Sequence, residues 1–77
     1  MKIVESYQVP NGRISPEIFS LPCVEYAYKF SDDIAYYLWP IYVKDKQYAR
    51  ATDWLCKDEQ GVWYILSDKE YNENKQQ

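Results

Sequence analysis

Residues 23–30 read Cys-Val-Glu-Tyr-Ala-Tyr-Lys-Phe and form the clearest strand pattern in this 77-residue chain. Large apolar side chains alternate with small or charged ones, which is the period of a β-strand. The alternation predicts that one set of side chains faces the core, namely Val24, Tyr26, Tyr28 and Phe30. The other set would face away from it.

The residues before this strand predict a second strand, a turn and a short helix. Residues 3–9 alternate apolar and polar positions and contain Ile, Val and Tyr, which favour strands. Residues 10–12, Pro-Asn-Gly, predict a turn because Asn and Gly tolerate positive φ. Residues 15–17, Ser-Pro-Glu, supply an N-cap, a proline at the first helical position and an acid in the first turn. Pro22 limits this helix to one or two turns.

Residues 31–39 allow two interpretations. Ser31, followed by two acids, fits the start of a helix that Pro40 would end. The same residues also fit a hairpin loop that leads into a strand over 34–43, whose β-branched and aromatic side chains favour a strand. Pro40 would restrict that strand to a sheet edge or a bulge. We favour the pair of strands.

Residues 46–57 are also open to two interpretations. Tyr48, Ala51 and Leu55 would share one face of a helix, and the alanines favour a helix slightly. Residues 54–56 suit a strand better.

The clearest later signal is a hairpin. Residues 54–56 are followed by a polar connection, in which Gly61 would take positive φ, and then by an apolar run over 62–66. The length and composition of that run predict a central strand covered on both faces.

These segments predict a mainly β protein that borders on the α+β class. We expect a small antiparallel sheet or barrel, of SH3-like or OB-like size, with four to five short strands and one or two short helices. A sheet covered by one helix is the alternative. A chain of this length buries roughly 60% of its surface, which is enough for one modest core. We therefore expect a single domain over residues 1–67, followed by a polar, partly frayed tail over residues 68–77.

The composition argues against most catalytic chemistry. Histidine is absent, so the usual general base, the commonest metal ligand and the histidine-activated nucleophile are all missing. Cys23 and Cys56 are too few for a structural zinc site. Whether the two cysteines pair is open, and we favour two reduced, half-buried thiols. Gly12 and Gly61 are the only glycines, so there is no phosphate-binding loop. We expect no enzyme activity, no cofactor and no metal.

Charge and hydropathy favour a cytoplasmic protein. The net charge is −3 and is spread evenly along the chain, which argues against binding to duplex nucleic acid. The longest apolar stretch, over residues 34–43, is too short to cross a bilayer. Residues 1–5 carry an acid where a signal peptide would be apolar. We expect no membrane association.

The aromatic composition points to binding. The chain has nine Tyr but two Phe, although Phe fills a core without needing a hydrogen-bond partner. Tyr and Trp are enriched at binding surfaces, where one edge of the ring is dry and the other is wet. A simpler explanation is that Tyr favours half-exposed strands. We predict a partner-binding surface built from six aromatic residues: Tyr26, Tyr28, Tyr36, Tyr37, Trp39 and Tyr42.

The function that fits best is a small non-catalytic protein-binding module. Compact, acidic inhibitors and adaptors, including those of phages and mobile elements, share its size and composition. The partner would be another protein, and a second copy joined through an edge strand is a further candidate. The alternative is a small barrel that binds single-stranded nucleic acid or a small ligand through stacking rings and cations. That site would comprise Lys44, Lys46, Tyr48, Arg50, Trp54 and Trp63.

The lack of histidine gives a first prediction. No side chain with an ordinary pKa titrates near neutrality, so we expect the activity to be nearly constant between pH 6 and pH 8. Partner binding measured across this range checks it. A sharp transition would reveal a cysteine or carboxylate with a strongly shifted pKa.

Overall fold

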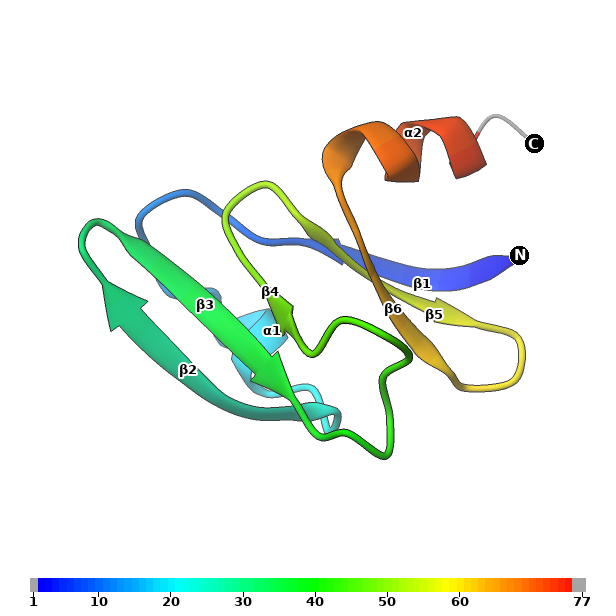
Figure 1. Cartoon of the computed structure of the whole chain (residues 1–77), viewed down its shortest axis with the longest axis horizontal. Coiled ribbons are helices and arrows are strands. Elements are labelled where there is room, and N and C mark those ends of the chain that lie inside the picture. Colours follow the sequence, from blue (N-terminus) through cyan, green and yellow to red (C-terminus); the bar gives the residue numbers. More distant parts are fainter. Residues whose placement is uncertain (1, 76–77) are drawn as a thin grey trace.

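The computed structural model describes residues 2–75 and contains two three-stranded antiparallel sheets (Figure 1). The first sheet has the order β1–β5–β6, formed by β1 (Ile3–Gln8), β5 (Trp54–Asp58) and β6 (Trp63–Leu66). The second has the order β2–β3–β4, formed by β2 (Val24–Phe30), β3 (Asp33–Leu38) and β4 (Tyr48–Ala49). The helices are α1 (Pro16–Phe19) and α2 (Asp68–Lys75). The predicted mainly β architecture is confirmed.

The core lies between the two sheets. Its buried side chains come from both sheets, from α1 and from the connections, and include Ile18, Ile34, Leu38, Leu55 and Ile65. Trp63 links the sheets through the backbone: its N–H donates to the Tyr42 carbonyl (2.8 Å), and its carbonyl accepts from Lys44 (3.0 Å). The segment after β3 therefore runs beside β6 and occupies that edge of the first sheet.

The largest fully buried side chain is Tyr36 in β3, which is 0% exposed. Its hydroxyl accepts a hydrogen bond from the Ser15 backbone N–H (2.7 Å). Ser15 is also the N-cap of α1, because its Oγ accepts from the Ile18 N–H (3.2 Å). The predicted cap and short helix are confirmed. A buried phenol therefore satisfies a backbone donor at the start of α1.

The core-facing side of β2 differs from the prediction. Tyr26 and Tyr28 are 46% and 56% exposed, whereas Val24 and Ala27 pack against the core. The register between β2 and β3 shifts between Val24 and Tyr26, so Glu25 is the extra residue of a β-bulge. Beyond a bulge, every side chain of a strand changes face. Strict alternation from Val24 therefore gave the wrong face for both tyrosines.

The two segments with two possible interpretations, residues 31–39 and 46–57, form strands and turns. β3 confirms that residues 31–39 contain a strand paired with β2 through a tight turn at Ser31 (φ 52°). The strand ends at Leu38 rather than at residue 43, and it is the central strand of its sheet rather than an edge. The slight preference for a helix after residue 46 was wrong. Ala49 is buried in β4, and Asp53 closes a turn by accepting the Arg50 N–H at Oδ2 (3.0 Å) and donating its own N–H to the Arg50 carbonyl (3.0 Å).

The predicted hairpin is confirmed as β5 and β6, with Gly61 at φ 83° in the connection. The expectation of a central strand over residues 62–66 was wrong. β6 lies at the end of the sheet and alternates buried and half-buried positions. The central strand is β5, in which the adjacent residues Leu55 and Cys56 are both fully buried.

Residues 68–75 form a helix that packs on the first sheet, where we expected a polar, partly frayed tail. Ser67 and Glu70 make a capping box: Ser67 Oγ accepts from the Glu70 N–H (3.1 Å), and Glu70 Oε1 accepts from the Ser67 N–H (2.8 Å). The Tyr71 ring stacks on Trp54 with centroids 3.7 Å apart. The Tyr71 hydroxyl bonds Ser6 Oγ (3.0 Å), so α2 is held by side chains from two strands.

Both cysteines are free and fully buried. Burial raises the pKa of Cys23 to about 11 and that of Cys56 to about 12. Lys57, the cation next to Cys56 in sequence, instead forms an ion pair with Glu5. Both thiols are therefore protonated near neutral pH and are poor nucleophiles. Within residues 2–75, no helix is long and apolar enough to cross a membrane.

The hydrogen bond of Tyr36 can be tested by removing one oxygen. Tyr36→Phe would leave the Ser15 N–H without its acceptor, so we expect a loss of about 1–2 kcal/mol in the free energy of unfolding. Tyr37→Phe is the matched control, because its hydroxyl has no protein partner in the described chain. Urea unfolding of both variants measures the difference. Equal stability of the two variants would show that the buried bond contributes nothing.

Candidate functional site

Three tyrosines form a stacked row on the outer face of the second sheet. Tyr26 of β2 lies opposite Tyr37 of β3, which in turn lies opposite Tyr48 of β4. The rings of Tyr26 and Tyr37 are nearly parallel, with centroids 4.7 Å apart, and those of Tyr37 and Tyr48 are 5.5 Å apart. We call these three residues the tyrosine row. It crosses the whole sheet, on the side opposite to α1, which lies behind this sheet in Figure 1.

Their hydroxyls distinguish these tyrosines from others in the chain. In the described structure, the hydroxyls of the tyrosine row make no hydrogen bond to protein. Three other tyrosines use their hydroxyls internally: Tyr36 bonds Ser15, Tyr7 donates to Glu5 (2.8 Å) and Tyr71 bonds Ser6. The tyrosine row therefore offers hydrogen-bonding groups to a partner, together with apolar ring surface.

Cations border the tyrosine row. Lys46 Nζ lies over the ring of Tyr48, 5.1 Å from its centroid, which is within cation–π distance. The same ammonium lies 3.7 Å from a carboxylate oxygen of Asp53. Arg50 follows Tyr48 by two residues and forms an ion pair with Asp33 (3.9 Å). The surface thus combines stacked rings with charges of both signs.

The structure brings together part of the predicted aromatic surface. Tyr26, Tyr28 and Tyr37 lie on the outer face of the second sheet, whereas Tyr36 is buried and contributes nothing to the surface. Trp39 and Tyr42 are exposed at the two ends of a turn, closed by the Tyr42 N–H to the Trp39 carbonyl (3.0 Å).

Two exposed residues escaped this prediction. Tyr48 completes the tyrosine row but was assigned to the alternative site, because only the pairing of β3 with β4 brings it beside Tyr37. Ile41, within the turn from Trp39 to Tyr42, is 84% exposed. An aliphatic residue beside a proline carries no signal of exposure, so the sequence could not have indicated it.

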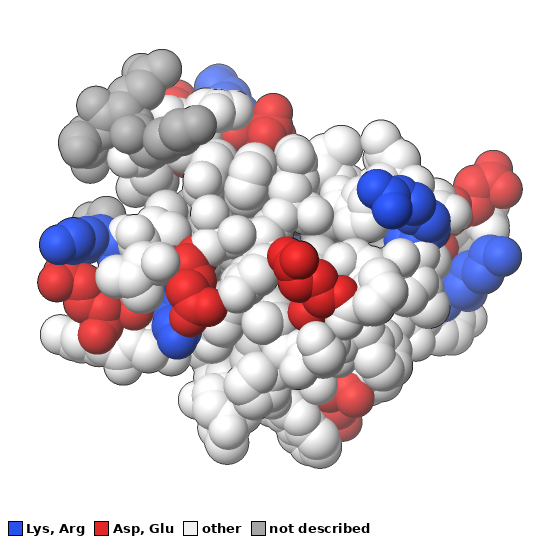
Figure 2. Space-filling view, turned by 180° about the vertical axis from the view of Figure 1, so that it is seen from behind, with Lys and Arg blue, Asp and Glu red and all other residues white. Residues whose placement is uncertain are grey.

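The alternative site is dispersed. Trp63 is buried in the core, and Trp54 packs between the sheet and α2, where its Nε1 donates to Asp68 (2.9 Å). Of the aromatic residues predicted for that site, Tyr48 alone is exposed among the described residues. Figure 2, which shows the rear of the molecule, has scattered charges of both signs rather than a basic groove. Single-strand binding relies on several stacking rings along such a groove.

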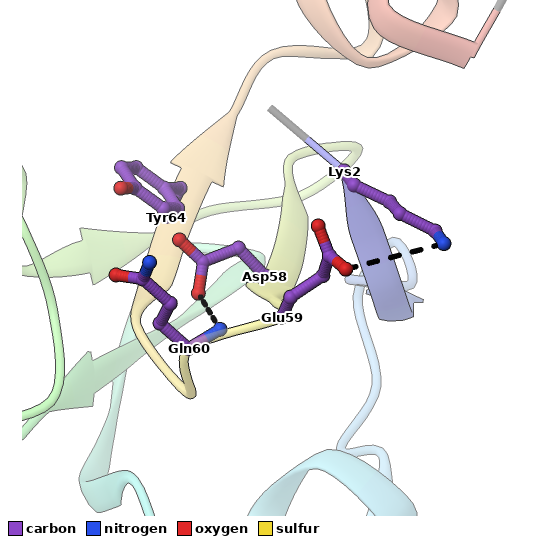
Figure 3. Close-up of a pocket in the computed structure, with 5 residues that line it drawn as sticks. All are labelled: Lys2, Asp58, Glu59, Gln60 and Tyr64. Atoms are coloured by element: carbon purple, nitrogen blue, oxygen red, sulfur yellow. Dashed lines mark hydrogen bonds and ion pairs between the residues drawn. The ribbon is translucent and has the colours of Figure 1, made fainter.

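A shallow pocket of about 280 Å³ lies at the connection between β5 and β6 (Figure 3). It is lined by Lys2, Asp58, Glu59, Gln60 and Tyr64. Asp58 Oδ1 accepts from the backbone N–H groups of Gln60 (2.9 Å) and Val62 (3.0 Å), so its carboxylate closes the turn. No group of three or more potential metal ligands is found in the described chain. Asp58 of this pocket therefore has a structural role.

Comparison with known proteins gave no match: no protein family, curated protein or solved structure resembles the chain closely enough to inform its function.

Because of the Asp58 carboxylate, we expect the free energy of unfolding to fall in acid. Hydrogen bonds from backbone N–H groups, above all that of Val62, lower its pKa below the ordinary value of 3.8. A carboxyl with a lowered pKa stabilises the fold above its unfolded pKa, and that contribution is lost as the pH falls through the folded value. Asp58→Asn should therefore be less stable than the natural protein at pH 7, and the difference should shrink at about pH 2.5.

Urea unfolding at the two pH values measures this difference. Glu59→Gln is the control from the same turn, because Glu59 is exposed and pairs only loosely with Lys2 (4.0 Å). A stability difference for Asp58→Asn that persists unchanged in acid would contradict the assigned role of the charge.

Proposed function

We propose that this protein is a small non-catalytic binding module that docks on another protein through the tyrosine row. The single observation that carries the proposal is the cross-strand stack of Tyr26, Tyr37 and Tyr48 on an exposed sheet face. Because the core is filled from the opposite face of the sheet, these rings are not needed to close it.

The stack is suited to binding because its rings are already ordered. A tyrosine supplies a large contact area with two rotatable side-chain bonds, and each ring of this row is held against its neighbour. Ordering side chains is one of the costs of association, so rings that are fixed before binding retain more of their contact energy. Tyrosine is among the residues that most often dominate such interfaces.

The border of the row adds electrostatic selectivity. The ammonium of Lys46 lies beside Tyr48 and is exposed to solvent. In protein interfaces, charges at the rim set orientation and association rate more than affinity. We propose that the partner presents an apolar patch to the rings and a carboxylate near Lys46.

The remaining groups favour binding over catalysis. Both thiols are buried with raised pKa values, and the described carboxylates with lowered pKa values, Glu5 and Asp58, hold structural contacts. A compact β scaffold with one presented face suits an inhibitor or an adaptor, which acts by covering or bridging a partner. This function needs no movement of the chain.

The test is affinity capture from lysate with a matched pair of variants. The natural protein should retain a stoichiometric partner, and Tyr26→Ser/Tyr48→Ser should weaken binding at least about tenfold, because it removes two of the three rings of the row. Val4→Ser/Ile14→Ser is the control, since these side chains are 50% and 51% exposed and lie outside the row. Titration of the purified partner by calorimetry gives the affinities.

Two results would overturn the proposal. One is repeated capture that returns no stoichiometric partner. The other is a partner that binds the tyrosine variant as tightly as it binds the control.

A further inference from the structure

The tyrosine row runs across the strands of the second sheet rather than along them. Its three rings come from β2, β3 and β4, one from each strand (Figure 1). A segment bound along the row therefore lies perpendicular to the strands. It cannot join the sheet as an additional strand, because an added strand runs parallel or antiparallel to the edge. Such a segment has to be recognised by ring contacts and phenol hydroxyls.

The spacing of the rings matches the repeat of a polyproline II helix. The centroids of Tyr26 and Tyr37 are 4.7 Å apart, and those of Tyr37 and Tyr48 are 5.5 Å apart. Neighbouring strands lie about 4.8 Å apart, so two steps across a sheet cover about 9.6 Å. A polyproline II helix rises about 3.1 Å per residue with three residues per turn, which gives a repeat of about 9.3 Å. Residues three apart in such a helix would therefore lie over Tyr26 and Tyr48.

The hydroxyls of the row supply what such a helix lacks. A polyproline II helix makes no internal hydrogen bonds, so its backbone carbonyls need donors from outside, and proline has no N–H to be satisfied. In the described structure, the three hydroxyls of the row make no hydrogen bond to protein, and each can donate one. The carbonyls of the helix and the phenols of the row are therefore complementary.

Proline side chains also suit the rings. A proline ring is apolar and fixed in shape, and surfaces lined by aromatic side chains are common receptors for proline-rich segments. Tyr26 and Tyr48 are 46% and 38% exposed, so both ends of the row are open to such a segment. The rings of the row are held against each other before binding. Because both sides are ordered in advance, the entropic cost of association is small.

We propose that the tyrosine row binds a proline-rich segment of the partner in the polyproline II conformation, laid across β2, β3 and β4. Prolines three residues apart pack on Tyr26 and Tyr48, and the Tyr37 hydroxyl donates to a carbonyl between them. Lys46, which lies over Tyr48, faces the end of the segment, where an acidic residue would meet its ammonium. This inference rests on the proposed function, because it names the chemistry that the same surface recognises.

A synthetic peptide tests this recognition directly. The probe is a blocked peptide of about nine prolines, which makes about three turns of the helix. The matched control is a blocked Gly-Ser peptide of the same length, which is a flexible coil. In titrations followed by NMR, the proline peptide should shift the amide resonances of β2, β3 and β4 with a dissociation constant below about 1 mM. The Gly-Ser peptide should shift none of them.

Three variants of the protein assign the contacts. Tyr26→Ser/Tyr48→Ser removes the two outer rings and should raise the dissociation constant at least about tenfold. Tyr37→Phe keeps the central ring but removes its donor, so we expect a rise of about fivefold. Val4→Ser is the control, because Val4 is 50% exposed on β1 of the first sheet, and it should leave the affinity unchanged. Circular dichroism confirms that each variant is folded.

Three results would overturn the proposal: no binding of the proline peptide at about 1 mM, equal binding of the Gly-Ser peptide, or full affinity in either tyrosine variant. Failure of this inference is distinguishable from failure of the proposed function. If the lysate partner depends on the tyrosine row but the proline peptide does not bind, this inference is wrong and the docking function stands.

Discussion

The burial of Tyr36 determines the outer face of the second sheet. Its ring fills the core and its hydroxyl satisfies the backbone at the start of α1, so β3 cannot turn over without exposing the ring and breaking that bond. Side chains alternate along a strand, so the neighbouring Tyr37 must point outward. The register with β2 and β4 then places Tyr26 and Tyr48 on either side of it. One internal contact thus sets the position of the whole tyrosine row.

Local patterns in the sequence predicted which strands and helices form better than they predicted which side chains of a strand face the core. The Ser15 cap, the strand expected over residues 23–30 and the hairpin around Gly61 each depend on a few neighbouring residues, and all three are present. The bulge at Glu25 depends on how β2 fits against β3, so no local pattern indicates it. A single extra residue was enough to exchange the inner and outer sides of β2.

The candidate site was only partly predictable for the same reason. An excess of tyrosine over phenylalanine indicated that many phenols have a polar role, but it did not distinguish internal hydrogen bonds from exposed surface. Tyr7, Tyr36 and Tyr71 bond inside the molecule, whereas the tyrosine row does not. The difference arises from the register between separate strands, as the contact of Tyr37 with Tyr48 illustrates.

The two thiols have a practical consequence. Cys23 directly precedes β2 in the second sheet, and Cys56 belongs to the central strand of the first, and neither is accessible in the folded chain. An alkylating reagent can modify a buried thiol only when the surrounding structure opens. The rates at which the two cysteines react therefore report the opening of each sheet separately, without any introduced label. A shared rate would mean that the two sheets unfold as one cooperative unit.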